Sequence, residues 1–139
     1  MLWHSQYVDD RTLNFFTRIM GTPQPDRNLV DFSLNAGFTL HEPFFGRDDD
    51  TFGIGLGYAH VSNYVAALER EENILGTPTP VQGSETFVEA TYQLQLTPWW
   101  QIQPDIQYVF NPGAGSVNPD TNQKIENELV VGVRTNILF

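Results

Sequence analysis

Polar side chains that can both give and receive hydrogen bonds stand at alternate positions near the C-terminal end of the sequence. In the run "TYQLQLTPWWQIQPDIQ" the alternating polar residues are Gln93, Gln95, Gln101, Gln103, Asp105 and Gln107. A carboxamide is at once a donor and an acceptor, so a row of them can exchange hydrogen bonds with water or with hydroxyl groups. Such a row suits a surface in contact with water.

The same alternation in other segments adds arginine, asparagine and acidic side chains to this set. Arginine contributes a planar fork of donors that suits neighbouring hydroxyl groups. The candidate ligand-contacting residues are Arg18, Asp31, Asn35, Glu89, Gln93, Gln95, Gln101, Gln103, Asp105, Gln107, Arg134 and Asn136. The alternative interpretation is that these side chains only solvate a polar surface and pair with one another across strands.

Polar residues at every second position, with apolar residues between them, predict β-strands that have one polar and one apolar face. In the last segment, for example, Leu129, Val131 and Val133 alternate with Gly132 and Arg134. The predicted strands cover residues 12–20, 30–40, 51–59, 85–96, 100–110 and 128–139, with residues 1–3 as the tail of a further strand. The predicted fold class is all-β, an antiparallel meander of six to seven strands.

The connections between the predicted strands alternate in length. The short connections are 4–11, 42–50 and 97–99, and the long loops are 21–28, 62–84 and 111–126. Proline, glycine and asparagine are frequent in the long loops, as expected for irregular segments. Residues 63–74 are expected to form a short helix within one of them, with Asn63 as its N-cap. Short turns should therefore lie at one end of the sheet and long loops at the other.

Soluble sandwiches and membrane barrels both show this alternation, but the strand lengths favour a membrane barrel. Strands of about 10–13 residues exceed the common soluble length of about 5–6 and suit a tilted crossing of a bilayer. Aromatic residues also gather near the strand ends, as they do at lipid headgroups. They are Trp3, Phe44, Phe45, Trp99, Trp100 and Phe139 at the short-turn end and Tyr108 and Phe110 at the other. A soluble β-sandwich that binds carbohydrate or mediates adhesion is the alternative.

The composition argues against several classes of function. The chain of 139 residues carries 7 basic and 17 acidic residues, a net charge of −10, whereas nucleic-acid binding needs a basic face. Without cysteine it has neither a disulfide framework nor a thiol nucleophile. The first residues lack the pattern of a signal peptide, and no apolar run approaches the roughly 20 residues of a membrane-spanning helix.

Three further motifs do not predict a site. The three glycines of "FGIGLGY" fall on one strand face with no helix after them, which disfavours a phosphate loop. The Asp48–Asp50 run lacks the glycine and distal glutamate of a calcium loop and is expected to be a solvated turn. His4, His41 and His60 lack metal-ligand spacing. No catalytic residue, metal or cofactor is expected, so the chain is not predicted to be an enzyme, although a barrel enzyme with catalytic groups elsewhere stays an alternative.

Several segments together resemble the carbohydrate-selective porin family typified by OprB. They are "MLW", "PDRNLVDFSLNAGFTL", "GRDDDTFGIGLGYAHVS", "ATYQLQLTPWWQIQPDIQYVFNPGAG" and "NELVVGVRTNILF". The most specific stretch is "YQLQLTPWWQIQPDIQYVFNPG", a strand, a tight Pro-Trp turn, a strand with a central Pro-Asp and a loop that opens on Asn-Pro-Gly. The resemblance covers essentially all 139 residues but only the C-terminal third or so of such a porin.

The resemblance implies that residues 1–139 are the C-terminal portion of a single barrel domain of about sixteen strands around a water-filled channel. It implies passive diffusion of mono- or oligosaccharides across the bacterial outer membrane, with lipid, the barrel-assembly machinery and, in a homotrimer, further copies as partners. Lumen-facing aromatics such as Phe16 and Phe87 would contact the apolar face of a sugar. Six strands and a stub are fewer than the roughly eight of the smallest single-chain barrels, so we expect a fragment. The alternative is a small barrel assembled from several copies.

The resemblance also assigns Gly132, Ile137 and Phe139 to the signal that the assembly machinery recognises. Replacing Phe139 by Asp in the complete porin is expected to reduce insertion into the outer membrane, because it removes apolar burial worth about 1.5–3 kcal/mol and adds a charge at the interface. The measurement is the amount of heat-modifiable folded barrel in isolated outer membranes. Normal insertion of Phe139→Asp would show that Phe139 is an ordinary strand residue.

Overall fold

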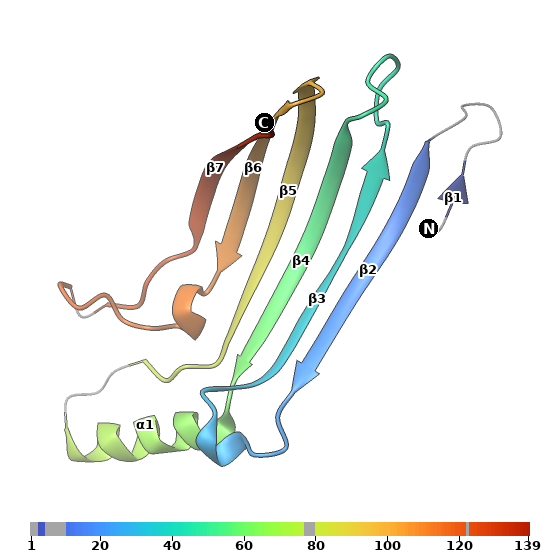
Figure 1. The fold of residues 1–139 in the computed structure, drawn as a ribbon. Coiled ribbons are helices and arrows are strands. Elements are labelled where there is room, and N and C mark those ends of the chain that lie inside the picture. The colour runs from blue at the N-terminus through green and yellow to red at the C-terminus, as the bar shows by residue number, and fades with distance from the viewer. Residues whose placement is uncertain (1–2, 5–10, 77–79, 122) are drawn as a thin grey trace.

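The strands form one antiparallel sheet in which each strand pairs with its neighbours in chain order (Figure 1). The computed structural model describes residues 3–4, 11–76, 80–121 and 123–139. The strands are β1 (Trp3–His4), β2 (Thr12–Gly21), β3 (Val30–His41), β4 (Thr51–Val61), β5 (Ser84–Thr97), β6 (Trp100–Phe110) and β7 (Glu128–Ile137). The helical elements are α1 (Asn63–Leu75) and the short 3-10 helices η1 (Pro25–Arg27) and η2 (Pro112–Ala114). The predicted all-β antiparallel meander is confirmed.

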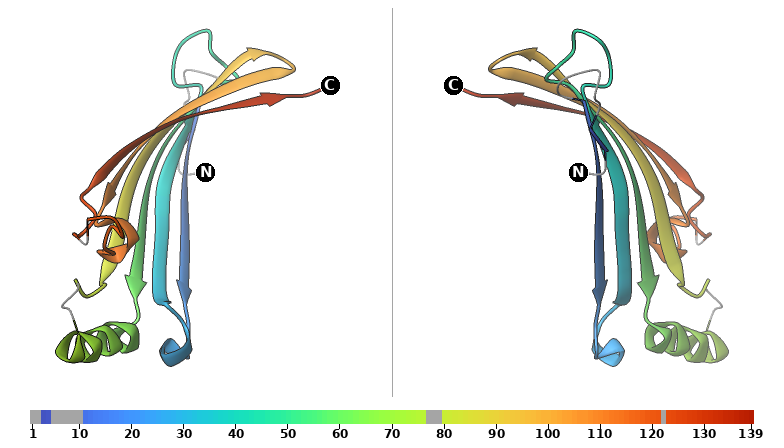
Figure 2. Two further views of the ribbon diagram at one scale, coloured as in Figure 1. Left: turned by 90° about the vertical axis from the view of Figure 1, so that its left-hand side faces the viewer. Right: turned by 90° about the vertical axis from the view of Figure 1, so that its right-hand side faces the viewer.

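The sheet is a single twisted layer (Figure 2). Helix α1 lies beyond the ends of the strands and covers neither face (Figures 1 and 2). Among the described residues, the buried apolar side chains are Val61 at the end of β4, Ala66 of α1, and Pro112 and Ala114 of η2. The described part of the chain contains no helix that is long and apolar enough to cross a membrane. The strands therefore do not enclose a hydrophobic core of their own.

The two ends of the sheet differ as predicted. Residues 42–50 and 98–99 connect strands tightly at one end, called here the turn end, where the C-terminus also lies (Figure 1). The segments with η1, α1 and η2 lie at the opposite end, called the loop end. The predicted short connection 4–11 falls outside the described residues except for its two ends, and the predicted strand residues Met1 and Leu2 also lie outside them.

The helix in the loop after β4 begins as predicted but is capped by a different residue. Ser62, rather than Asn63, is the N-cap, and its Oγ accepts a hydrogen bond from the Tyr64 amide at 3.3 Å. The same hydroxyl is fully buried and donates to the carbonyl of Pro25 at 2.6 Å. A hydroxyl suits this position because it can cap α1 and hold η1 at once. The Ser62 contacts thus join the two loops that flank β3 and β4.

The loop end is further held by contacts between the loop after β4 and the loop after β6. The Gln82 side chain donates to Ser116 Oγ at 2.7 Å, and the Gln82 amide donates to Glu69 of α1 at 2.8 Å. The Gly83 amide donates to the carbonyl of Ala114 at 2.8 Å. These bonds satisfy backbone groups of irregular segments, so the long loops fold back on one another rather than extending separately.

The β5–β6 ladder is interrupted opposite Pro104, which has no amide proton to donate. Thr91 pairs with Asp105, and the next pair toward the turn end is Leu94 with Ile102. Within the gap, Thr91 Oγ1 donates to the carbonyl of Pro104 at 3.3 Å. A side chain therefore replaces part of the missing backbone bonding, which allows a proline in a strand that has neighbours on both sides.

The turn between β3 and β4 is fastened to β5 by the carboxylate of Asp50, which is 1% exposed. Arg47 donates to both carboxylate oxygens, with distances of 2.7 Å from Nε to Oδ2 and 3.0 Å from NH2 to Oδ1. Tyr92 Oη donates to Oδ2 at 2.7 Å, and the Gln95 amide donates to Oδ1 at 2.8 Å. The prediction of a solvated Asp48–Asp50 turn is thus wrong for Asp50, because three donors from the turn and from β5 replace its water.

The pKa of the Asp50 carboxyl lies below its ordinary value. Burial alone raises this pKa, but the hydrogen bonds from Arg47, Tyr92 and the Gln95 amide outweigh that effect. A group with a lowered folded-state pKa stabilises the fold above its unfolded pKa. The stabilisation is lost as the pH falls through the folded-state pKa.

Replacing Asp50 by Asn is expected to destabilise the folded protein by about 1–3 kcal/mol at neutral pH, because buried donors lose a charged acceptor. Urea-induced unfolding in detergent measures this loss. The difference from wild type should begin to shrink as the pH falls below about 4, where the carboxyl of the unfolded chain starts to bind a proton, and should vanish once the pH passes below the lowered folded-state pKa. Asp49→Asn is the control, since Asp49 is exposed in the same turn. Equal losses of unfolding free energy in both variants, or a difference that does not change with pH, would contradict this account of the turn.

Candidate functional site

The register of the sheet aligns alternate residues of neighbouring strands into rows on one face, called here the polar face. The central row, from β2 to β7, is Phe16, Gly37, Gly55, Glu89, Gln107 and Val130. The next row toward the turn end is Asn14, Thr39, Gly53, Thr91, Asp105 and Gly132. The next row toward the loop end is Arg18, Asn35, Gly57, Phe87, Val109 and Glu128. The polar face is thus continuous across the strands rather than confined to one of them.

Strands β5 and β6 bring six of the predicted residues together, and most of these side chains pair across the ladder. Gln107 Nε2 donates to Glu89 Oε2 at 3.3 Å, and Gln101 Nε2 donates to Gln95 Oε1 at 2.5 Å. Gln103 Nε2 donates to Thr91 Oγ1 at 2.9 Å. A carboxamide bound through one group keeps further donor and acceptor capacity. Cross-strand pairing therefore orients these side chains and leaves them further capacity to donate and accept hydrogen bonds.

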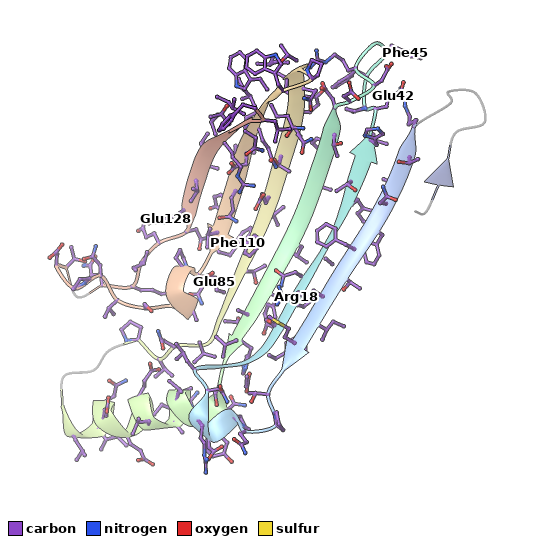
Figure 3. The ribbon with its side chains drawn as sticks, viewed as in Figure 1. Arg18, Glu42, Phe45, Glu85, Phe110 and Glu128 are labelled. Atoms are coloured by element: carbon purple, nitrogen blue, oxygen red, sulfur yellow. The ribbon has the colours of Figure 1, made fainter. Side chains whose placement is uncertain are left out.

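The other predicted residues on this face lie on β2, β3, β5 and β7. Arg18 pairs with Asn35 between β2 and β3, and Gln93 pairs with Thr51 of β4. The β7 partners follow the same register, with Arg134 opposite Gln103, Asn136 opposite Gln101 and Gly132 opposite Asp105. Charged side chains lie on several strands, as the labelled Arg18 of β2, Glu85 of β5 and Glu128 of β7 show in Figure 3. The arrangement can offer a moving solute a succession of donors and acceptors.

Asp31 occupies a different setting from the other predicted residues. The β3–β4 register shifts between Val30 and Phe32, so Asp31 lies at a bulge without a partner in the ladder. Its Oδ1 lies 2.7 Å from His60 Nδ1. Sequence reasoning missed this pair because it treated His60 as an isolated histidine and assumed unbroken alternation. Local periodicity contains no signal for a bulge of this kind.

Two aromatic rings cover glycines on the polar face. A Cβ added to Gly37 would lie 2.7 Å from the ring of Phe16, and one added to Gly57 would lie 2.1 Å from the ring of Phe87. The rings therefore lean across the strand next to their own, and the absence of a Cβ is what permits the approach. Between them a pocket of about 240 Å³ opens over β3, β4 and β5. No group of acidic, histidine or cysteine side chains in the described part of the chain is suited to hold a metal ion.

The opposite face, called the apolar face, carries most of the large aliphatic and aromatic side chains of the same strands. Its central row is Phe15, Phe38, Ile54, Ala90, Ile106 and Val131. Neighbouring rings contact each other here, with 5.2 Å between the ring centroids of Phe15 and Phe38. Ile19, Val131 and Val133 are nevertheless 67%, 69% and 71% exposed. Side chains of this kind in contact with water would be strongly unfavourable, so this face requires an apolar environment.

The residues assigned to the assembly signal lie on or just after β7. Ile137 pairs with Trp100 at the turn end, and Phe139 follows the end of the strand with its side chain exposed. The Leu138 amide donates to the carbonyl of Trp99 at 2.8 Å. Trp99 and Trp100 stack beside this point with ring centroids 6.2 Å apart. Aromatic side chains therefore lie at the turn end of the sheet, and the labelled Phe45 lies at the same end on the β3–β4 turn (Figure 3).

Known proteins share this sequence and fold. The family model described as "Carbohydrate-selective porin, OprB family" matches residues 1–139. Porin B of Pseudomonas aeruginosa is 28% identical over 120 residues, which are 81% of this chain and 25% of Porin B. A structure of OprB from Pseudomonas putida determined at high pH superposes with a TM-score of 0.76 at 24% identity, over 92% of this chain and 30% of that chain.

The three comparisons agree with the geometry of the sheet. The chain spans about a quarter of the length of the curated relative that it matches. The solved structure shows the same fold over nearly all of the chain. Because the family model covers every residue, the chain belongs to the carbohydrate-selective porin family OprB.

Proposed function

We propose that this chain forms part of the wall of a passive sugar channel in the bacterial outer membrane. The observation that carries the proposal is the two-sided sheet, with hydrogen-bonding side chains on one face and exposed apolar side chains on the other. In a barrel wall the polar face borders a water-filled lumen and the apolar face borders lipid. A soluble sandwich would need a second sheet against the apolar face, and the described residues form one sheet.

Residues 1–139 are proposed to be one portion of a single porin barrel rather than a set of separate domains. Each strand pairs with the next, so the described sheet offers no internal boundary at which to divide it. The relatives are three to four times longer than the matched region, since it makes up 25% of one and 30% of the other. The rest of such a barrel supplies the strands that pair with β1 and β7 and close the channel.

The proposed mechanism is diffusion with brief hydrogen bonding. A sugar hydroxyl can exchange a water partner for a carboxamide of Gln93 or Gln101, or for the guanidinium of Arg134, at little net cost. Because many similar groups line the path, no single contact needs to be strong, and weak contacts allow fast release. Nothing in this process makes or breaks a covalent bond, and it requires neither a catalytic residue nor a cofactor.

Two partners are proposed from the same features. The barrel-assembly machinery would bind the segment that contains Gly132, Ile137 and Phe139, which forms a strand ending beside clustered aromatics. A homotrimer would bury part of the apolar face of each copy against its neighbours, as lipid does elsewhere. Both proposals rest on the family membership of the chain.

Reconstitution tests the proposed function. Liposomes that contain the complete porin are expected to swell in isotonic solutions of neutral monosaccharides, because the solute enters and water follows. The rate should rise in proportion to the amount of porin and stay low in protein-free liposomes. A porin that conducts ions in planar bilayers but leaves sugar swelling at the protein-free level would contradict a sugar channel.

Arginine substitutions on adjacent residues of β6 test which face meets lipid. Ile106→Arg is expected to reduce the folded barrel strongly, because an arginine on the lipid face near the midplane costs about 2–4 kcal/mol. Gln107→Arg is the matched control, since Gln107 is its neighbour on the polar face and its side chain contacts Glu89. The amount of heat-modifiable barrel in outer membranes gives the comparison. Equal losses in the two variants would exclude the assigned orientation.

A further inference from the structure

Gly55 is one of the residues that line the pocket on the polar face. A Cβ added to Gly55 would meet nothing closer than the carbonyl oxygen of Ala36 at 3.9 Å, so the space above this residue is open. Its neighbours along the same row are Gly37 on one side and Glu89 on the other. The backbone of β4 therefore forms the floor, and no side chain rises from its centre. The volume of about 240 Å³ is smaller than the roughly 300–1,000 Å³ that encloses a drug-sized ligand.

Two aromatic walls face this floor from opposite sides. Phe16 extends from β2 over Gly37, and Phe87 extends from β5 over Gly57, so both rings lean toward the strands that form the floor. Phe16 is 48% exposed although it lies on the polar face. A ring on a lumen-facing surface gains little from water and is free to contact the apolar side of a solute.

The rim of the pocket is polar. Asn35, Thr39, Glu89 and Thr91 line it together with the two rings. Gln107 fixes Glu89 from the next strand by donating to its carboxylate at 3.3 Å. The pocket thus combines apolar walls with donors and acceptors at its edge, and it has room for one small ring.

We propose that this pocket is a subsite for a single sugar ring and that Phe16 and Phe87 determine its preference for cyclic sugars. The inference rests on the proposed channel function and specifies which solutes the wall favours. A pyranose presents C–H groups on its ring faces and hydroxyls around its edge. The rings of Phe16 and Phe87 match the C–H groups, and the amide, hydroxyl and carboxylate groups of the rim match the hydroxyls.

The glycines are what make the subsite possible. Gly37 and Gly57 let the two rings lie close to the sheet, and Gly55 leaves the space between them empty. A Cβ at position 55 would enter this space with no heavy atom closer than the Ala36 carbonyl oxygen at 3.9 Å. Because Gly55 has room for a Cβ and Gly37 and Gly57 do not, a substitution at Gly55 is expected to fill the pocket and leave the fold intact.

Ion-current block in planar bilayers measures binding in the complete porin. D-glucose is the cyclic probe, and D-sorbitol, which has a similar set of hydroxyls and no ring, is the acyclic control. Wild-type porin is expected to show saturable block by glucose at lower concentration than by sorbitol. Phe16→Ala and Phe87→Ala should each raise the half-blocking concentration of glucose by about two- to tenfold and leave that of sorbitol nearly unchanged.

Gly55→Val should also weaken glucose block, while its heat-modifiable barrel stays at the wild-type level. Phe15→Ala is the control for loss of an aromatic ring, because Phe15 precedes Phe16 on the apolar face and should not affect block by glucose. Unchanged glucose block in Phe16→Ala, Phe87→Ala and Gly55→Val would overturn the subsite while leaving the channel function intact. A loss of folded barrel in Gly55→Val would overturn it as well, because another part of the protein would then fill the pocket. Failure of wild-type porin to pass sugars in the swelling assay would instead reject the channel itself.

Discussion

Backbone hydrogen bonding between neighbouring strands is the interaction on which this structure depends. The sheet is a single layer, and each strand between β2 and β6 satisfies its amide and carbonyl groups on two neighbours. No second layer packs against the described residues, so burial of apolar side chains within the described part of the chain is confined to a few residues near the loop end. In lipid, where water cannot replace these bonds, a closed set of strand ladders is one of two ways to span the bilayer. The favourable free energy of removing the apolar face from water must then come from contact with its surroundings rather than from packing within the chain.

Side-chain contacts complete the ladder where the backbone alone cannot. Pro104 interrupts the β5–β6 ladder, and Thr91 bridges part of the gap. At the turn end, Asp50 collects donors from its own turn and from β5, which fixes the β3–β4 hairpin to the next strand. At the loop end, Ser62 and Gln82 bind separate loops to one another. Asp50 and Ser62 are buried, so their contacts also supply partners for polar groups that water does not reach.

The polar face combines two properties that a sugar channel needs. Its carboxamides pair across β5 and β6, so they are oriented but still able to exchange partners. Its glycines lie under the rings of Phe16 and Phe87 and leave an open floor at Gly55. The width of the channel and the chemistry of its lining are therefore set by the same strands, because the residue type at each lumen-facing position decides both. The apolar face follows from the same alternation, with lipid rather than water as its solvent.

The sequence by itself determined the elements and their two faces, because a strand exposes alternate residues to opposite sides and the pattern is local. Strand positions and the meander could be predicted in this way, and the helix after β4 could be predicted from its own local sequence. The family was predicted from the resemblance of several segments to a known family. The tertiary structure alone decided which residues stand opposite one another. Asp31 meets His60 because a bulge shifts the register, and Asp50 is buried because Tyr92 and Gln95 come from a strand more than 40 residues away. The pocket over Gly55 has the same origin, since the walls from β2 and β5 meet only once four strands are paired. Local periodicity contains no information on register or on such distant partners, so these features required the folded sheet.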